Sequence, residues 1–132
     1  MDEAVRQLVR QRAHDRCEYC RLPQAGAPFV RFHVEHIRAR QHGGGDAPGN
    51  LALACPRCNA YKGPNLSAVD AANDETVPLF NPRVDHWDDH FTLVGAIITG
   101  RTAIGRATAA LLDMNAEERI KLRCELLDHG EW

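Results

Sequence analysis

The chain has 132 residues, the size of one domain with a modest hydrophobic core. Five cysteines, an odd number, argue against the disulfide framework of a small secreted protein and for a metal site in a reducing compartment. The net charge of −2 conceals two unlike halves: residues 1–62 hold ten Lys and Arg against six Asp and Glu, and residues 63–132 hold six against twelve. The basic half suits contact with nucleic acid, and a solvated basic face is an equal alternative.

The N-terminal segment has the pattern of an amphipathic helix. Val5, Leu8 and Val9 recur at helical spacing among Arg and Gln, which predicts a helix over residues 2–14. The segment lacks the apolar core of a signal peptide, and no later apolar stretch is long enough to cross a bilayer. We therefore expect a cytoplasmic protein that has no contact with membranes.

A strand, a loop, a short strand and a helix are expected next. Residues 29–37 alternate side chains as a strand does, and the Gly-rich segment RARQHGGGDAPGN that follows predicts a loop. Residues 51–55 predict a short strand or a turn. Residues 56–62 predict a helix, because Pro56 suits a first helical turn and a Gly-Pro pair ends the segment.

The C-terminal half is expected to contain a linker and a second set of elements. Residues 67–81 are polar with scattered Pro, which predicts a linker over the surface. The cluster DHWDDH at residues 85–90 predicts a hydrated turn with Trp87 packed inward, in preference to a second metal site. A strand or hairpin bent at Gly95 and two helices, the last one capped by Asn115, are expected at residues 91–99, 102–112 and 115–128. The predicted fold class is therefore α+β.

Four of the cysteines form two CxxC pairs separated by 34 residues, at Cys17, Cys20, Cys55 and Cys58. Paired CxxC knuckles present four thiolates to one tetrahedral Zn²⁺, and a site filled by four protein ligands is structural. The fifth, Cys124, lies among leucines of the last predicted helix, which predicts a small core residue.

Polar residues with catalytic capacity lie between the two knuckles. The stretches HVEHIRARQHGG and NLALACPRCNAYKG resemble the HNH endonucleases, in the branch whose ββα-metal motif, the His-Me finger, is clamped by two CxxC pairs. The likeness covers residues 17–63, and residues 64–132 resemble the C-terminal extension of small stand-alone HNH proteins. The resemblance implies a single nuclease domain over residues 1–132 whose zinc-stapled core is flanked by helices and followed by a strand and helix extension.

The resemblance also implies roles for individual residues. His36 corresponds to the first motif letter and the general base, and Asn50 to the middle letter, which orients the loop after that histidine. Asn59 takes the third letter, so the motif is an HNN form in which Asn59 and Glu35 bind the catalytic metal ion. Three basic residues are expected to contact nucleic acid: Lys62, Arg38 and Arg40.

The chemistry of these residues agrees with phosphodiester hydrolysis. A neutral histidine can take a proton from water at neutral pH. A carboxylate and an amide oxygen form a sparse, hard ligand set that favours Mg²⁺ or Mn²⁺ and leaves positions open for phosphate. We therefore expect a metal-dependent endonuclease whose partner is nucleic acid, most simply double-stranded DNA.

Two further histidines have open roles. His33 lies two residues before Glu35, so alternation puts both on one strand face, where His33 either assists the metal ion or is a plain surface residue. His42 precedes the Gly run and is expected to have a loop role in preference to a phosphate contact.

Two rival functions are weighed against the nuclease. A zinc deaminase would use His33 and Glu35 as its HxE pair with a PCxxC, but here Pro follows the first Cys of the second pair, and the first CxxC would have no role. A non-catalytic zinc-ribbon module that binds nucleic acid without cutting it is the stronger alternative. Against it, every catalytic position is filled by a competent residue.

Overall fold

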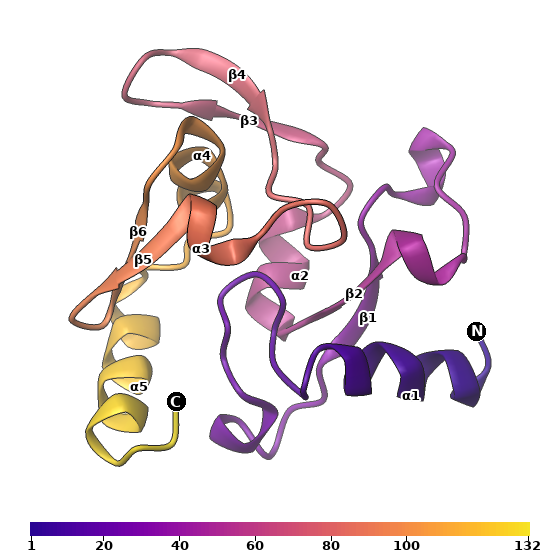
Figure 1. Ribbon diagram of the computed structural model, residues 1–132, viewed down its shortest axis with the longest axis horizontal. Helices are drawn as coiled ribbons and strands as arrows, with labels where there is room; N and C mark the ends of the chain where they lie inside the picture. The colour runs from indigo at the N-terminus through magenta and orange to yellow at the C-terminus, as the bar shows by residue number, and fades with distance from the viewer. The chain divides into compact units, whose positions relative to one another are not determined.

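The computed structural model describes residues 1–132 and divides into two compact units, Met1–Pro64 and Asn65–Trp132 (Figure 1). The boundary falls directly after the Gly-Pro pair that was expected to end the second helix. The predicted α+β class is confirmed, since short antiparallel strand pairs alternate with helices. That residues 1–132 act as a single nuclease domain stays a prediction.

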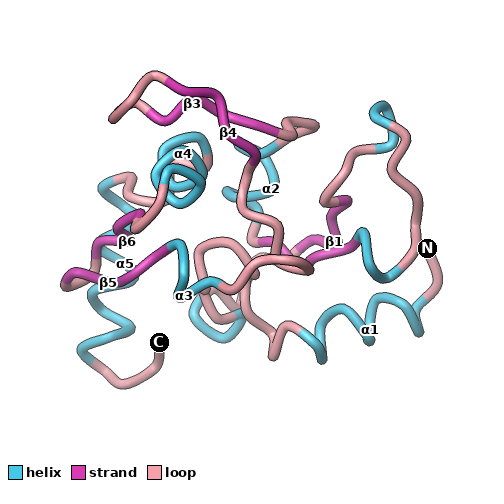
Figure 2. The backbone as a smooth tube through the Cα atoms, turned by 45° about the horizontal axis from the view of Figure 1, so that its top comes forward, coloured by secondary structure: helices cyan, strands magenta, loops and turns pink.

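The first unit is built around a ββα motif. Its regular elements are α1 (Glu3–Arg12), β1 (His33–His36), β2 (Leu51–Ala54) and α2 (Pro56–Lys62). The two strands pair antiparallel, with Glu35 opposite Ala52 and His36 opposite Leu51. Figure 2 shows the long loop, broken by two single turns of 3₁₀ helix, that joins β1 to β2. The predicted order of strand, loop, strand and helix is therefore confirmed.

The core of this unit lies on β2 because all four of its residues are buried. A strand buried on both faces is continuously apolar, which is what LALA provides. The N-terminal helix is tied to the strand through Arg12, whose guanidinium donates to the carbonyl oxygens of Pro48 at 3.0 Å and Leu51 at 2.7 Å. The Asp2 side chain caps the start of α1 by accepting from the Val5 N–H.

The first strand is shorter than predicted. Of the strand expected over residues 29–37, only His33–His36 form a strand. The Gln24 side chain makes hydrogen bonds to the residues directly before His33. Gln24 Nε2 donates to the Val30 carbonyl at 2.7 Å, and Gln24 Oε1 accepts from the Phe32 N–H at 3.1 Å. These bonds hold the segment as a loop.

The second unit contains three helices and two hairpins: β3 (Ser67–Asp70), β4 (Glu75–Pro78), α3 (Trp87–His90), β5 (Phe91–Val94), β6 (Ile97–Gly100), α4 (Ala103–Leu111) and α5 (Glu117–Asp128). The predicted hairpin bent at Gly95 and both long helices are confirmed. Gly105 in α4 is required by close packing, since a Cβ there would lie 1.9 Å from the His90 carbonyl oxygen.

The predicted linker over residues 67–81 is wrong, because most of that segment pairs as the β3–β4 hairpin. Asp70, fully buried at the end of β3, explains the difference. Its carboxylate accepts from the Arg106 guanidinium of α4 at 2.8 and 3.1 Å. This ion pair joins residues that are 36 positions apart in the sequence, so local composition did not reveal it. Within the cluster DHWDDH, only Trp87–His90 form a one-turn helix, α3, directly before β5, where a hydrated turn was expected.

Two predictions for the last helix are also wrong. Cys124 is exposed, and the neighbouring Arg123 is buried in its place, because its guanidinium donates to the carbonyl oxygens of Ala96 and Met114 at 2.7 and 2.8 Å. Asn115 does not cap α5. Its side chain instead forms hydrogen bonds with both the N–H and the carbonyl of Ile98 on β6.

No helix of either unit has the length and apolar character that a membrane span requires.

Candidate functional site

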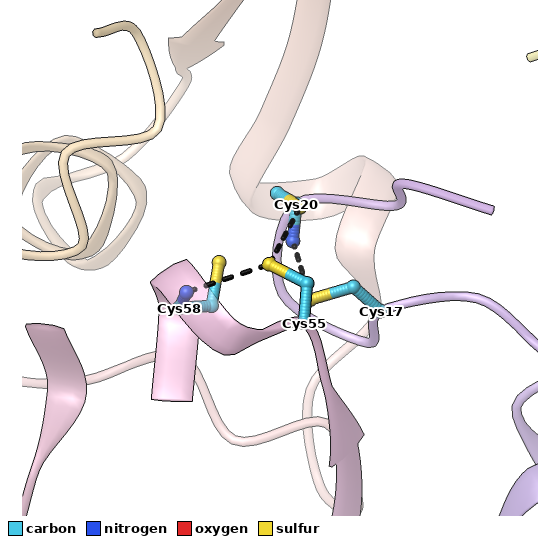
Figure 3. Close-up of side chains that lie close together, drawn as sticks. All are labelled: Cys17, Cys20, Cys55 and Cys58. Carbon is cyan, nitrogen blue, oxygen red and sulfur yellow. Dashed lines mark hydrogen bonds between the residues drawn. The ribbon is translucent and has the colours of Figure 1, made fainter. Parts of the chain in front are cut away.

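The four cysteines of the CxxC pairs meet in one buried cluster (Figure 3). Cys17 and Cys20 lie in the turn that follows α1. Cys55 is the residue directly before α2, and Cys58 lies in the first turn of that helix. All four sulfur atoms lie within 4.8 Å of one another, and the Sγ atoms of Cys20 and Cys55 are 3.8 Å apart. The predicted four-cysteine cluster is confirmed.

The geometry of this cluster fits a tetrahedral zinc ion. Four thiolates at the usual Zn–S length of about 2.3 Å are separated by about 3.8 Å. Each knuckle also directs a backbone N–H at a sulfur, from Cys20 to Cys17 at 3.5 Å and from Cys58 to Cys55 at 3.4 Å. Burial raises the pKa of the Cys17 thiol well above its ordinary value, so metal binding must displace a proton there. The cluster can therefore hold a structural metal ion.

The first knuckle also contacts the strand pair through the two residues between its cysteines. Glu18 forms two bonds with Leu53 of β2: its N–H donates to the Leu53 carbonyl, and its carboxylate accepts from the Leu53 N–H, both at 2.8 Å. Tyr19 is fully buried, and its hydroxyl donates a hydrogen bond to Glu35 on β1. The metal cluster and the candidate catalytic strand are therefore directly connected.

A second site lies at the end of β1. Glu35, His36 and Asn59 line one pocket of about 420 Å³, together with the start of the Gly-rich loop and the Gly63-Pro64 end of α2. The register of β1 brings Glu35 and His36 to this end, and α2 contributes Asn59 one residue after a cluster cysteine. The three residues that were predicted to bind metal and take a proton thus share a pocket.

Glu35 is almost completely buried in this site and has two partners. The Tyr19 hydroxyl donates to Oε1, and the Lys62 ammonium lies 3.1 Å from Oε2. Burial raises the pKa of the Glu35 carboxyl above its ordinary value, while the charge of Lys62 and the Tyr19 hydrogen bond act in the opposite direction. The acid is therefore held in one orientation by groups from two other segments.

His36 has a carboxylate partner from the Gly-rich loop. Its Nε2 lies 2.7 Å from Oδ1 of Asp46, and Arg40 Nη2 contacts both oxygens of the same carboxylate at 2.8 and 3.0 Å. The hydrogen bond with His36, supported by the charge of Arg40, holds the pKa of the Asp46 carboxyl below its ordinary value. Asp46 is therefore ionised at neutral pH.

Asn50 connects the two ends of the loop that carries Asp46. Its Oδ1 accepts from the Arg38 N–H at 2.9 Å, and its Nδ2 donates to the carbonyl oxygens of Arg38 and Gly45 at 3.0 and 2.8 Å. The backbone at Gly44 lies so close to Arg38 that a Cβ on Gly44 would be 1.7 Å from the Arg38 carbonyl oxygen. Gly44 is thus required by its close approach to Arg38 and Asn50, whereas a Cβ at Gly45 would meet no atom within 4 Å.

Comparison with known proteins agrees with this geometry. Residues 17–65 match the family model described as HNH endonuclease. This part of the chain, 49 of its 132 residues, is therefore similar to the HNH endonucleases. Neither the search of curated proteins nor the search of solved structures gave a match. The matched range begins at the first cluster cysteine and includes both strands, the Gly-rich loop and α2.

Lys62 does not lie where a phosphate contact was expected. Its side chain is 2% exposed, and besides Glu35 it donates to the carbonyl oxygens of His36 and Ile37 at 3.1 and 2.9 Å. A phosphate contact would require Lys62 to leave all three acceptors. Its position is that of an internal counter-ion for Glu35.

The other two residues expected to contact nucleic acid, Arg38 and Arg40, are exposed. Arg40 lines the pocket, and Arg38 extends its guanidinium over the loop, where Nε donates to the His42 carbonyl at 2.6 Å. His42 is exposed in this loop. His33 is exposed on β1 and is not part of the sulfur cluster, whose four positions the cysteines fill. The zinc ligand set of a deaminase is therefore not formed.

Sequence reasoning missed two residues of the candidate site. Asp46 is the only acidic residue between His36 and Lys62, a signal that was available in the sequence. Tyr19 gave no such signal, because its contact with Glu35 depends on how the knuckle folds against β1.

Proposed function

We propose that residues 17–65 belong to the HNH endonuclease family and hydrolyse phosphodiester bonds of DNA, with His36 as the general base. The observation that carries this proposal is the pocket lined jointly by Glu35, His36 and Asn59 within the segment that matches the HNH endonuclease model. A nuclease needs a proton acceptor beside a cation site, and these residue types supply both. The four-cysteine cluster holds zinc in this proposal and takes no part in the chemistry.

Glu35 and Asn59 are the proposed ligands of a divalent ion, Mg²⁺ or Mn²⁺. Their carboxylate and amide oxygens suit hard cations that keep open positions. Tyr19 and Lys62 already contact Glu35. A carboxylate nevertheless has about four lone-pair positions, so these two contacts leave capacity for a metal ion. When bound, the ion polarises the phosphate and offsets charge on the leaving oxygen.

His36 supplies the proton transfer. A neutral imidazole accepts a proton from the water whose oxygen attacks phosphorus, the bond from phosphorus to the leaving oxygen breaks, and that oxygen takes a proton from solvent. Exposed Arg38 and Arg40 bring positive charge to the loop after His36, which favours approach of the DNA backbone. Contacts of this kind carry no base information, so the proposed substrate is double-stranded DNA without a stated sequence.

One observation favours a second function, binding of nucleic acid without cleavage. Both oxygens of Glu35 are engaged by protein groups, as in a purely structural ion pair. A zinc-ribbon module would need the basic surface and the four-cysteine cluster and would use no divalent ion.

The test is incubation of supercoiled plasmid with the purified protein and Mg²⁺ or Mn²⁺, beside a His36→Ala variant and a sample with EDTA. Nicked or linear product in the first sample alone is the expected result. Removal of a general base costs about 10²–10⁴ in rate, so the variant should be essentially inactive. A folded protein that binds the plasmid and never cuts it would support the binding module instead.

A further inference from the structure

We propose that Asp46 is a positioning residue for His36: it accepts the hydrogen bond from Nε2–H and thereby leaves Nδ1 as the proton acceptor. This inference rests on the proposed function. The Nε2 to Oδ1 distance is 2.7 Å, short enough for a strong hydrogen bond. An ionised carboxylate can only accept, so the proton of a neutral imidazole must lie on Nε2. The lone pair is then on Nδ1 of a side chain that lines the pocket.

The carboxylate is itself held in place on two sides. Arg40 contacts both of its oxygens through the single nitrogen Nη2, at 2.8 and 3.0 Å. The backbone is anchored one residue earlier, where Asn50 Nδ2 donates to the Gly45 carbonyl. In an ordinary surface ion pair, most of the favourable electrostatic free energy is offset by the entropy lost when two long side chains are ordered. Here the loop is ordered by Asn50, so Asp46 can restrain the imidazole at small additional entropic cost.

The role of Asp46 differs before and during the reaction. In the ground state it selects the tautomer and the ring orientation of His36. As the attacking water loses its proton to Nδ1, the ring becomes an imidazolium, and the hydrogen bond to Asp46 becomes charge-assisted. The proton stays on His36 while the phosphorus bond to the leaving oxygen breaks, and solvent later removes it. Asp46 stays ionised throughout, so it touches neither the substrate nor the reacting atoms.

The kinetic test compares Asp46→Asn and Asp46→Ala with the wild-type protein. Removal of a residue that orients a functional group costs about 10–100-fold, and we expect this loss in kcat with KM unchanged. In a His36→Ala background the same substitutions should cost nothing further, because Asp46 acts only through His36. Glu3→Gln is the matched control, since it removes an exposed carboxylate of α1 and should leave cleavage unchanged.

Imidazole ¹⁵N NMR decides the proposal independently of cleavage, with the His36→Ala spectrum assigning the signals. We expect one tautomer, protonated on Nε2, in the wild-type protein, and nitrogen shifts that move toward the average of both tautomers in Asp46→Ala. Unchanged shifts in that variant, or an equal rate loss in the His36→Ala background, would overturn the role of Asp46. A wild-type protein with the expected tautomer that cuts no DNA would overturn the proposed function and leave the orientation of His36 by Asp46 supported.

Discussion

The two metal-competent regions within residues 17–65 are built on opposite principles. The four-cysteine cluster is closed: its donors are four buried sulfur atoms, and tetrahedral coordination would be complete without water. The pocket at the end of β1 is open: it offers oxygen and nitrogen donors, and the His36 side chain is 21% exposed beside a half-exposed Asp46. A closed site stabilises a fold, whereas an open site leaves room for substrate. This difference supports our proposal that the sulfur cluster stabilises the fold and that the pocket carries the chemistry.

The two regions nevertheless share a boundary. Tyr19 belongs to the first knuckle, and its hydroxyl orients the pocket residue Glu35. Lys62, at the end of the helix that begins at the second knuckle, holds the same carboxylate from the other side. Tyr19 and Lys62 therefore connect the cluster to the pocket. Substitutions in the cluster, at these two connecting side chains and in the pocket can separate effects on stability from effects on cleavage.

The largest effect is expected from Cys58→Ser. Structural zinc sites contribute about 10–16 kcal/mol of apparent binding free energy in small domains, and loss of one thiolate leaves the four-ligand site incomplete. We expect the variant to lose zinc and residues 1–64 to unfold, as measured by metal analysis and residue-resolved amide exchange. Cys124→Ser is the matched control, because that cysteine is exposed and lies outside the cluster. Zinc retained at the wild-type level in Cys58→Ser would contradict the assignment.

A substantial loss of stability is also expected from Lys62→Met. The ammonium is buried with Glu35, and removal of one partner of a buried ion pair costs about 3 kcal/mol or more because the other charge stays uncompensated. Chemical denaturation should show this loss while zinc remains bound. Unchanged stability together with weakened DNA binding would restore the original prediction that Lys62 faces phosphate.

Asn59→Ala should act on the pocket alone. Loss of a proposed ligand should raise the Mg²⁺ concentration for half-maximal cleavage by about 10–100-fold, with zinc content and the unfolding midpoint unchanged. A Mg²⁺ titration of the cleavage rate measures the effect. The same titration curve for variant and wild type would remove Asn59 from the metal site.

The smallest effect is expected from Tyr19→Phe. The substitution keeps the ring in the core and removes one hydrogen bond to Glu35, which costs about 1–3 kcal/mol when a buried acceptor loses its partner. Zinc should stay bound, and cleavage should fall modestly because Glu35 is less firmly oriented. Tyr61→Phe, at a 43% exposed tyrosine, is the matched control. Equal unfolding curves for the two variants would show that the Tyr19 hydroxyl does not connect the two regions.

The features that the sequence predicted depend on local spacing. The CxxC pairs, the Gly-rich loop and the Pro56 start of α2 each follow from residues close together in the chain. What escaped prediction depends on partners distant in sequence: Gln24 ends β1 early, Asp70 orders a hairpin through Arg106, and Arg123 displaces Cys124 from the buried face of α5. Burial of these polar groups is possible only because their hydrogen bonds are made in the folded chain.

The candidate site divides in the same way. Glu35, His36 and Asn59, which the motif spacing selected, line one pocket, and their roles as base and metal ligands stay predictions. The contacts of these residues did not follow from spacing. Lys62 is buried in an ion pair with Glu35, and Asp46 forms a hydrogen bond with His36 from the other part of the loop. A position in a motif identifies the residue type that the chemistry requires, whereas its neighbours are set by tertiary packing.

The most direct test of the division between the two regions uses protein that holds one zinc ion per chain and is otherwise free of divalent metal. Supercoiled plasmid is added, Mg²⁺ or Mn²⁺ is titrated in, and both cleavage and zinc content are followed. Our account predicts no cleavage with zinc alone, cleavage that rises with the added ion, and constant zinc content throughout. Cleavage by the zinc-loaded protein before any addition, or loss of cleavage only when zinc leaves, would contradict it.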